Sequence, residues 1–451
     1  MRSASRSSLH SPPAALAWEH AQALCGLLIR DGASRASLAE RQARKLRALI
    51  AHCRRSVALY REHWRDVPLD AAQAALPGAI VALPTIGKDD FRRRPLEDAL
   101  AAGADSRRLL RHSTSGSSGQ PFTVCRSARE EHLLNLFRIR AQRRAGLRVS
   151  DRLARFSQLA QESKRGWPGR VREALGIHRS IVLDGLAPAG AMVEALLGFR
   201  PTVVCGYPST LQQIATALSA RDRQRVRPRL LFCGGELLTA SARRAIEAAF
   251  GAPLVEFYGA HEFNLLASQC PAGHGYHVCD DSVLVEIVDE RGRPVPVGTR
   301  GEVVATALHS YTMPFVRYRT GDLAIRGGDA CACGARCSTL RAIEGRSADY
   351  LRLPGGRRMH PYAITAQLAD REGAWVTQHQ LVQMAATEVV LQLRTARPAT
   401  LADVDRVRAA GAAILGPDVR FDVVVVEHIA TGPSGKFRPY VTLPADTAAS
   451  G

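Results

Sequence analysis

Residues 113–119, STSGSSG, place five hydroxyl side chains and two glycines in a stretch that cannot stay helical. Gly116 and Gly119 allow backbone N–H groups to approach an anion closely, and the hydroxyls add further donors, so the segment is suited to bind phosphate. No Lys-Ser or Lys-Thr pair follows the glycines, which excludes a Walker A loop. A flexible surface linker is the alternative interpretation of the same composition. The other motifs of the chain must distinguish a phosphate-binding segment from a flexible linker.

The ten cysteines fall into two populations. One population is scattered among apolar residues and is interpreted as small buried side chains: Cys25, Cys53, Cys125, Cys205 and Cys233. The other gathers in two short segments, CPAGHGYHVC (270–279) and CACGARC (331–337). Glu19 and His20 interrupt the first apolar stretch, so we expect no secretory signal, and a metal site is favoured over a disulfide framework. Five unrelated reduced cysteines are the alternative.

The chain is basic, and its basic residues are almost all arginines. Lysines and arginines together number 61, the formal net charge is +19, and lysine occurs only at Lys45, Lys88, Lys164 and Lys436. The arginines are spread along the whole length without a long basic block, so we favour a general arginine bias over a nucleic-acid interface. With 46% hydrophobic and 23% charged residues and no long uncharged apolar run, the sequence predicts a cytoplasmic globular protein without a membrane span.

Alternating strand and helix patterns predict the fold class. Residues 36–64 form an amphipathic pattern with Leu38, Leu46, Ile50 and Leu59 on one stripe, and residues 128–145 also appear helical. Residues 201–220 predict a strand, a turn and a helix, whereas residues 228–262 predict a parallel strand pair with a crossover helix. Residues 281–325 have a hairpin pattern.

A change in the pattern of expected strands and helices near residues 343–351 predicts a domain boundary. The following segments TEVVLQLRTA, LADVDRVRAAGAAILG and RFDVVVVEHI indicate a strand, a helix and a strand. We therefore expect a mixed α/β fold, with a large N-terminal domain that has a β-rich part over residues 1–344 and a small mobile α+β domain over residues 345–451.

Five short segments occur in a fixed order: STSGSSGQP, GGE (234–236), YGAHE (258–262), YRTGD (318–322) and GPSGKFR (432–438). Together they resemble the core motifs of the adenylate-forming superfamily. Within it, LPTIGKDDFR, GYPSTLQQIA and the late paired cysteines are most similar to the phenylacetate-CoA ligase-like branch, which includes capsule-locus and deazaflavin-coenzyme ligase homologues. The resemblance covers roughly residues 40 to 440, and each motif is weak without the others.

The resemblance implies a role for each motif. Glu262 would hold Mg²⁺, Tyr258 would stack on adenine, Asp322 would accept hydrogen bonds from the ribose hydroxyls, and Arg346 would hold the nucleotide at a hinge over residues 346–349. The β- and γ-phosphates of ATP are assigned to Ser113, Thr114, Ser115, Gly116, Ser117, Ser118 and Gly119. The remaining nucleotide contacts are assigned to Gly234, Gly235, Glu236, Gly259 and Arg319.

Lys436 is the strongest candidate for a catalytic side chain. A compact ammonium on a flexible loop can reach between a carboxylate and the α-phosphate and stabilise the charge that grows there. A solvated terminal lysine is the alternative, but a lysine is an unusual choice in a chain that otherwise uses arginine.

Relatives of this branch often carry a Cys, a His and a Cys-x-Cys pair at the two cysteine segments. The resemblance therefore implies a structural zinc site formed by Cys270, His277, Cys331 and Cys333, because zinc takes four nitrogen or sulfur ligands in a tetrahedron. His274 and Cys337 are competing ligands, and Cys279 is interpreted as a packed thiol.

The implied activity is ATP- and Mg²⁺-dependent adenylation of an organic acid, expected to be aryl, followed by acyl transfer to coenzyme A. Within the same class, the acceptor could be a carrier protein or an amine, or the reaction could stop at the AMP adduct. A basic zinc-containing nucleic-acid binding protein is the hypothesis from another class. The sequence specifies neither the acid nor the oligomeric state.

Overall fold

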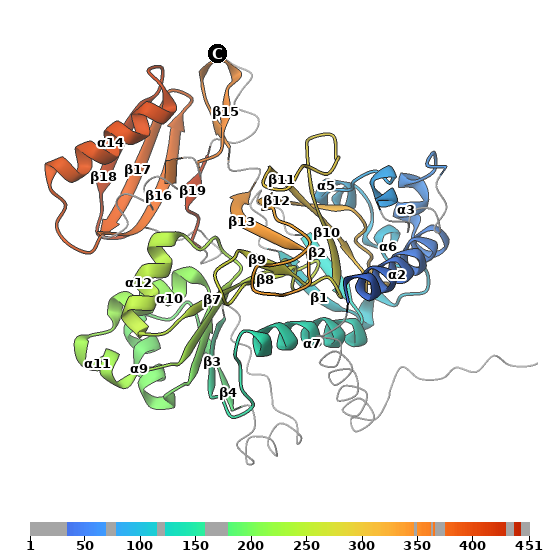
Figure 1. The fold of residues 1–451 in the computed structure, drawn as a ribbon, viewed down its shortest axis with the longest axis horizontal. Coiled ribbons are helices and arrows are strands. Elements are labelled where there is room, and N and C mark those ends of the chain that lie inside the picture. Colours follow the sequence, from blue (N-terminus) through green and yellow to red (C-terminus); the bar gives the residue numbers. More distant parts are fainter. Residues whose placement is uncertain are drawn as a thin grey trace, which may run out of the picture.

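A computed structural model describes residues 34–68, 78–114, 122–157, 179–346, 350–361, 364–365, 375–429 and 437–442. In this part of the chain the largest sheet has eleven strands in the order β10-β11-β12-β13-β9-β8-β7-β6-β5-β3-β4 (Figure 1). The mixed α/β fold expected from the sequence is confirmed.

One half of this sheet is parallel. It comprises β3 (Leu153–Ser157), β4 (Ser180–Asp184), β5 (Val203–Gly206), β6 (Leu230–Gly234) and β7 (Leu254–Tyr258). The predicted crossover unit is confirmed, since α12 (Ala240–Phe250) connects the parallel strands β6 and β7. GGE begins at the carboxyl end of β6 and YGAHE at that of β7, the edge at which ligands bind in open α/β sheets.

The other half is antiparallel. It comprises β8 (Ala267–Gln269), β9 (Tyr276–Val278), β10 (Val283–Val288), β11 (Arg300–Ala307), β12 (Tyr318–Arg326) and β13 (Thr339–Arg346). The hairpin pattern predicted for residues 281–325 corresponds to β10, β11 and β12.

Helices cover both faces of the parallel half, because its strands are apolar on both sides. On one face lie α9 (Ala189–Phe199), α10 (Pro208–Ala217) and α12, whose side chains pack with Val204 and Leu231; α11 (Ala220–Arg225) follows α10. On the other face, α7 (Ala128–Arg144) packs Ala141 against Val203 and Cys205 (Figure 1). The alternation along β5 thus directs Cys205 toward α7.

The N-terminal helical segment is divided where one helix was expected. α2 (Arg35–Ser56) and α3 (Ala58–His63) meet at Val57, which has extended dihedral angles of φ −123° and ψ 114°. A β-branched side chain favours that conformation, and here it is fully buried in the main core. Leu38, Leu46, Ile50 and Leu59, the predicted stripe, are all buried.

Short elements connect these helices to the sheet. They are η2 (Ala79–Ala82), α5 (Lys88–Arg92), α6 (Leu96–Ala99), η3 (Ser106–Arg108), β1 (Leu110–Thr114) and β2 (Phe122–Arg126). β1 and β2 form an antiparallel hairpin with Thr114 opposite Phe122, so both ends of the STSGSSG loop are fixed at one point.

A second sheet of four strands lies toward the C-terminus, in the order β18-β17-β16-β19. Its strands are β16 (Val376–Ala385), β17 (Glu388–Thr395), β18 (Arg420–Val425) and β19 (Tyr440–Val441), and α14 (Leu401–Leu415) packs on it. β14 (Leu351–Arg352), η5 (Pro354–Gly356) and β15 (Arg358–Met359) precede it. The predicted strand–helix–strand order is confirmed, whereas the boundary at residue 344 stays a prediction. None of the helices in the described ranges is long and apolar enough to cross a membrane.

A buried arginine anchors the segment that leads into α5. Arg317 is 2% exposed, and its guanidinium binds Glu286 through two nitrogens at 2.9 and 3.0 Å. It also donates to the backbone carbonyls of Leu83 at 2.6 Å and Gly292 at 2.7 Å. A buried charge must be paired and hydrogen-bonded, and this bidentate geometry satisfies that requirement.

Replacing Arg317 with Met should destabilise the protein strongly, because Glu286 would stay buried without its partner. Burial already raises the pKa of Glu286, and Arg317 opposes that rise. We expect the variant to lose about 3–5 kcal/mol of unfolding free energy in urea denaturation. The double variant Arg317→Met/Glu286→Leu should recover much of this loss. A single variant as stable as the double variant would contradict the assignment.

Candidate active site

Two crossed hydrogen bonds join the YGAHE and YRTGD motifs. The hydroxyl of Tyr258 donates to Asp322 Oδ2 at 2.7 Å, and the hydroxyl of Tyr318 donates to Glu262 Oε1 at 2.9 Å. Each motif therefore supplies one tyrosine and one carboxylate, and each tyrosine binds the carboxylate of the other motif. The expected magnesium and ribose ligands are thereby brought to one place.

Burial controls the charge of this group. It raises the pKa of Asp322, and the guanidinium of Arg346, whose Nε lies 3.7 Å from Asp322 Oδ1, opposes that rise. Burial and the adjoining carboxylates also raise the pKa of Tyr258 and Tyr318 well above the usual tyrosine range. Both hydroxyls therefore stay protonated and act as donors at neutral pH.

Tyr258 lies with its ring in the main core, next to the strand end that carries the motif. Its role in adenine stacking stays a prediction. Tyr318 was part of a recognised motif, but its bond to Glu262 was not foreseen from the sequence.

In the GGE turn, neighbouring atoms lie too close to the backbone to leave room for a side chain. A Cβ at Gly234 would lie 2.3 Å from the carbonyl oxygen of Phe257, and a Cβ at Gly235, which has φ +82°, would lie 2.9 Å from the Tyr207 ring. A side chain at position 234 would displace backbone, and one at position 235 would meet the Tyr207 ring in a backbone conformation that favours glycine. Gly259 is equally constrained, since its Cβ would lie 2.2 Å from the carbonyl oxygen of Asn264. These glycines let neighbouring parts of the protein approach the main chain closely at this edge of the sheet.

Glu236 connects this turn to the C-terminal segment. Its carboxylate accepts hydrogen bonds from the backbone N–H and the hydroxyl of Ser209, both at 3.0 Å. It also accepts a hydrogen bond from the backbone N–H of Phe437 at 3.2 Å. Phe437 follows Lys436 directly, so the position next to the predicted catalytic lysine lies at the GGE turn.

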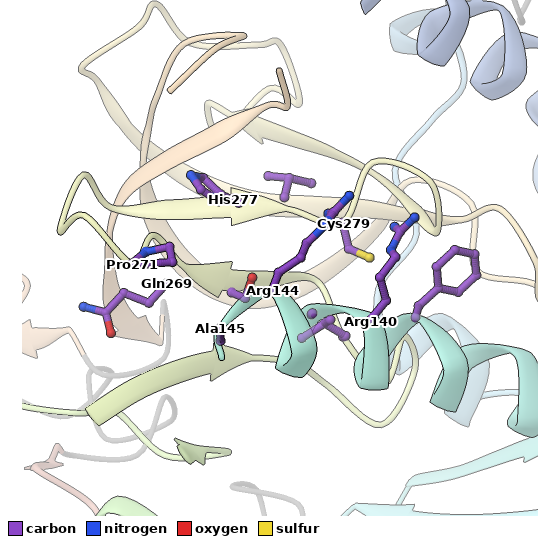
Figure 2. Close-up of a pocket in the computed structure, with 12 residues that line it drawn as sticks. Arg140, Arg144, Ala145, Gln269, Pro271, His277 and Cys279 are labelled. Carbon is purple, nitrogen blue, oxygen red and sulfur yellow. The ribbon is translucent and has the colours of Figure 1, made fainter. Parts of the chain in front are cut away.

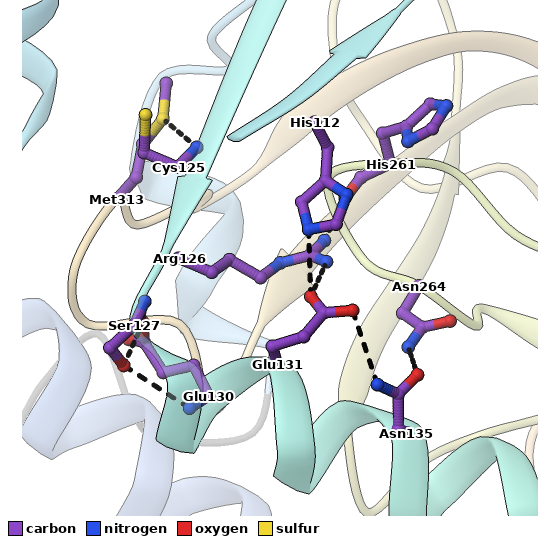
Figure 3. A network of polar contacts seen from close by, with 10 residues as sticks. All are labelled: His112, Cys125, Arg126, Ser127, Glu130, Glu131, Asn135, His261, Asn264 and Met313. Carbon is purple, nitrogen blue, oxygen red and sulfur yellow. Dashed lines mark hydrogen bonds and ion pairs between the residues drawn. The ribbon is translucent and has the colours of Figure 1, made fainter. Parts of the chain in front are cut away.

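An ionic network supports the base of the STSGSSG loop (Figure 3). His112, on β1, lies 3.0 Å from the Glu131 carboxylate, which also pairs with Arg126 at 2.9 Å. Arg126 donates in addition to the backbone carbonyl of His261, in YGAHE. The hydrogen bond from His112 and the charge of Arg126 hold the pKa of Glu131 down at about 2, so this carboxylate is ionised at every physiological pH. The network ties the loop to the YGAHE motif through α7.

Lys88 was one of the four lysines found in the sequence, but no role was assigned to it there. Its Nζ lies 5.7 Å from the centre of the Phe122 ring, the first described residue after the loop. Burial and the neighbouring Arg92 lower the pKa of Lys88, and the charge of Glu262 raises it. The ammonium therefore lies within electrostatic reach of Glu262 and beside Phe122. The scarcity of lysine was the signal that could have found it.

The side chain of Arg319 does not join the tyrosines and carboxylates of the crossed pairs. Its guanidinium binds the hydroxyl of Thr85 at 2.9 Å and pairs with Glu302. Ser115, Gly116, Ser117, Ser118, Gly119 and Lys436 lie outside the described residues, as do positions 347–349 of the expected hinge. Ser113 and Thr114 are placed as the last two residues of β1.

The four predicted zinc ligands form one cluster. The ligand atoms of Cys270, His277, Cys331 and Cys333 all lie within 4.8 Å of one another. The sulfurs of Cys270 and Cys331 are 3.7 Å apart, and the Cys333 sulfur is 3.4 Å from His277 Nε2. The competing His274 and Cys337 are not in the cluster. Three thiols and one imidazole at such distances fit the donor set of a tetrahedral zinc site.

A small pocket adjoins this cluster (Figure 2). Arg140 and Arg144 extend from α7 toward β9, which carries His277, and toward Cys279, which follows it. Arg140 is paired with Asp281 at 2.7 Å. Burial raises the pKa of the Cys279 thiol, in agreement with its interpretation as a packed side chain.

Residues 112–309 match the family of AMP-binding enzymes. The phenylacetate-coenzyme A ligases of Thermus thermophilus and Pseudomonas putida are each 26% identical to the chain over 340 residues, covering 72% of it and 74% of each relative. A crystal structure of 2-hydroxyisobutyryl-CoA ligase in the postadenylation state, in complex with R3-HIB-AMP, superposes with a TM-score of 0.74 at 21% identity. The superposition covers 92% of this chain and 91% of that one. The chain thus has a match to AMP-binding enzymes over residues 112–309, phenylacetate-CoA ligases among its homologues, and the fold of a structure of 2-hydroxyisobutyryl-CoA ligase.

Proposed function

We propose that this protein is an AMP-forming ligase that adenylates a carboxylic acid with ATP and transfers the acyl group to coenzyme A. The observation that carries the proposal is the crossed pairing of Tyr258 with Asp322 and of Tyr318 with Glu262, which brings two carboxylates together, of which Glu262 acts electrostatically on Lys88. The homology to phenylacetate-coenzyme A ligases supports both the acid substrate and the acceptor.

In the first half-reaction an oxygen of the acid attacks the α-phosphorus, the bond to the bridging oxygen breaks, and pyrophosphate leaves. Asp322 accepts hydrogen bonds from the ribose hydroxyls, and Arg346 holds the nucleotide next to it. Lys88 binds the β- and γ-phosphates together with the loop that ends at Phe122, and so stabilises the leaving pyrophosphate. Glu262 would hold Mg²⁺, which supplies charge screening for the phosphates.

Lys436 stabilises the charge on the α-phosphate as the adenylate forms. The hydrogen bond from the backbone N–H of Phe437 to Glu236 supports this role, because it holds the adjoining residue at the GGE turn. In the second half-reaction the thiol sulfur of coenzyme A attacks the acyl carbon, its proton is released, and AMP leaves. The C-terminal sheet would rotate near Arg346 between the two steps.

The decisive experiment is acid-dependent exchange of labelled pyrophosphate into ATP, followed by detection of an acyl-CoA thioester when coenzyme A is added. Aryl, aliphatic and amino acids are screened in parallel. Salt-sensitive nucleic-acid binding without any exchange would favour the other class of function instead.

Lys88→Ala should lower pyrophosphate exchange by roughly 100-fold or more, because a positioned charge on the leaving group is lost. Lys88→Arg should restore part of the rate. Lys45→Ala, which removes an exposed lysine on α2, serves as the matched control and should leave exchange unchanged. Equal rates for Lys88→Ala and the control would refute the phosphate role.

Lys436→Ala should affect the two half-reactions differently. We expect exchange to fall by about two to three orders of magnitude. Thioester formation from a preformed acyl-adenylate should persist, since the lysine acts on the α-phosphate during adenylation. Near-normal exchange in this variant would show that Lys436 has no part in the first step.

The Cys/His cluster would hold a structural zinc ion that joins the β8–β9 turn to the segment before β13. Metal analysis of the purified protein should find about one zinc per chain. Cys331→Ser should lose the metal and lower the melting temperature, whereas Cys337→Ser, outside the cluster, should retain it. A metal-free wild-type protein with full stability, or metal loss in Cys337→Ser, would count against the site.

A further inference from the structure

Glu262, the expected magnesium ligand, lies in a turn that several hydrogen bonds hold in place. The residue is 7% exposed, and its Oε1 accepts the hydrogen bond from the Tyr318 hydroxyl at 2.9 Å. Within the described part of the chain its second oxygen accepts no hydrogen bond, which leaves that oxygen for a cation. Carboxylate oxygens are ligands that Mg²⁺ takes in proteins, so Glu262 fits the metal that the family resemblance implies.

The turn is held at the residues on either side of Glu262 (Figure 3). Before it, Arg126 of β2 donates to the backbone carbonyl of His261. After it, the side-chain amide of Asn264 donates to Asn135 Oδ1 on α7 at 2.9 Å. Asn264 has φ +63°, a left-handed conformation that asparagine tolerates better than most residues, and it closes the turn. A shift of the metal ligand would therefore strain at least one of these two bonds.

The carboxylate of Glu131 is the acceptor that both ties share. Its Oε2 accepts from Arg126 Nη1 at 2.9 Å and lies 3.0 Å from His112 Nε2. Its Oε1 accepts from the amide of Asn135 at 3.3 Å. Arg126 is 3% exposed, so Glu131 is the counter-charge of a buried cation. The two oxygens of this carboxylate thus orient the guanidinium and the amide that hold the turn around Glu262.

The same carboxylate also holds the hairpin that carries the STSGSSG loop. His112 lies on β1 and directly precedes Ser113, whereas Arg126 is the last residue of β2. The two strands are paired in register up to the ends of the loop, so an anchor on each strand fixes the loop base. The segment assigned to the phosphates and the turn assigned to the metal are therefore positioned against one side chain, that of Glu131.

We propose that Glu131 is a positioning residue that fixes the distance between the phosphate-binding loop and Glu262, so that one complex of Mg²⁺ and ATP can contact both. This inference rests on the proposed adenylation and adds to it the residue that links metal binding to nucleotide binding. A cation held by both the phosphates and a protein carboxylate strengthens ATP binding only when the loop and the carboxylate are correctly spaced. Loss of the spacing should therefore weaken ATP binding more in the presence of Mg²⁺ than in its absence, whereas general loss of packing would weaken both equally.

The test measures ATP affinity by equilibrium dialysis of labelled ATP, without acid or coenzyme A, in buffer freed of divalent cations and with or without added Mg²⁺. The quantity compared between variants is the ratio of the two dissociation constants. Glu131→Gln keeps the size of the side chain but removes its charge, and we expect it to lower this ratio by about 10-fold. Asn135→Ala, which removes the link to Asn264 but keeps the ion pair with Arg126, should lower the ratio less. Glu194→Gln, at an exposed position of α9, is the matched control and should keep the wild-type ratio.

Pyrophosphate exchange supplies a second readout. Glu131→Gln should need more Mg²⁺ for half-maximal exchange at a fixed ATP concentration, while the KM for the acid stays unchanged. A rise in the KM for the acid by the same factor would indicate a general loss of packing and would overturn the inference. Circular dichroism melting identifies a variant that fails to fold, and Asn135→Ala then carries the test, because it leaves the buried ion pair intact.

The outcomes separate this inference from the ligase proposal. An unchanged ratio in the folded variants, or an equal loss of ATP affinity with and without Mg²⁺, overturns the inference and leaves the ligase proposal standing. A wild type that supports exchange but binds ATP equally with and without Mg²⁺ has the same consequence. A wild type that neither binds ATP nor supports exchange with any acid overturns both proposals.

Discussion

The crossed pairing of two tyrosines with two carboxylates, of which Glu262 is buried and Asp322 half-buried, is the constraint on which the site depends. Glu262 is 7% exposed, and its motif follows a parallel strand, whereas Asp322 lies on an antiparallel strand. Without the two hydroxyl donors, each carboxylate would lose a hydrogen bond, and for the buried Glu262 that loss is costly. The pairing therefore connects the YGAHE motif after β7 with the YRTGD motif on β12, and with them the groups proposed to bind the metal and the ribose.

Buried arginines hold the segments around this centre together. Arg317 ties the segment before α5 to β10 and β12, which fixes the start of the helix that carries Lys88. Arg126 and Glu131 tie the hairpin of the STSGSSG loop to YGAHE. Each of these charges is satisfied inside the protein.

Much of this arrangement was predictable from the sequence, because motifs at strand ends must meet at one edge of a sheet. The family resemblance identified the GGE and YGAHE motifs, which lie at two such strand ends, and it implied the four zinc ligands, whose ligand atoms lie within 4.8 Å of one another. Other features depend on tertiary partners that no local pattern reveals. The break at Val57 follows from its burial in the core, and Arg319 turns to Thr85 and Glu302 although it stands within a nucleotide motif. The approach of Lys88 to Glu262 joins residues far apart in the chain.

The carboxylate of Glu236 binds residues from both the large domain and the C-terminal segment. The same carboxylate holds Ser209, at the start of α10, and the backbone N–H of Phe437. Ser209 follows Tyr207 by two residues, and the ring of Tyr207 lies against Gly235. Because a carboxylate has only two oxygens, the donors from Ser209 and Phe437 must be arranged together around it. The start of α10 and the residue that follows Lys436 are therefore positioned by the same carboxylate at the GGE turn.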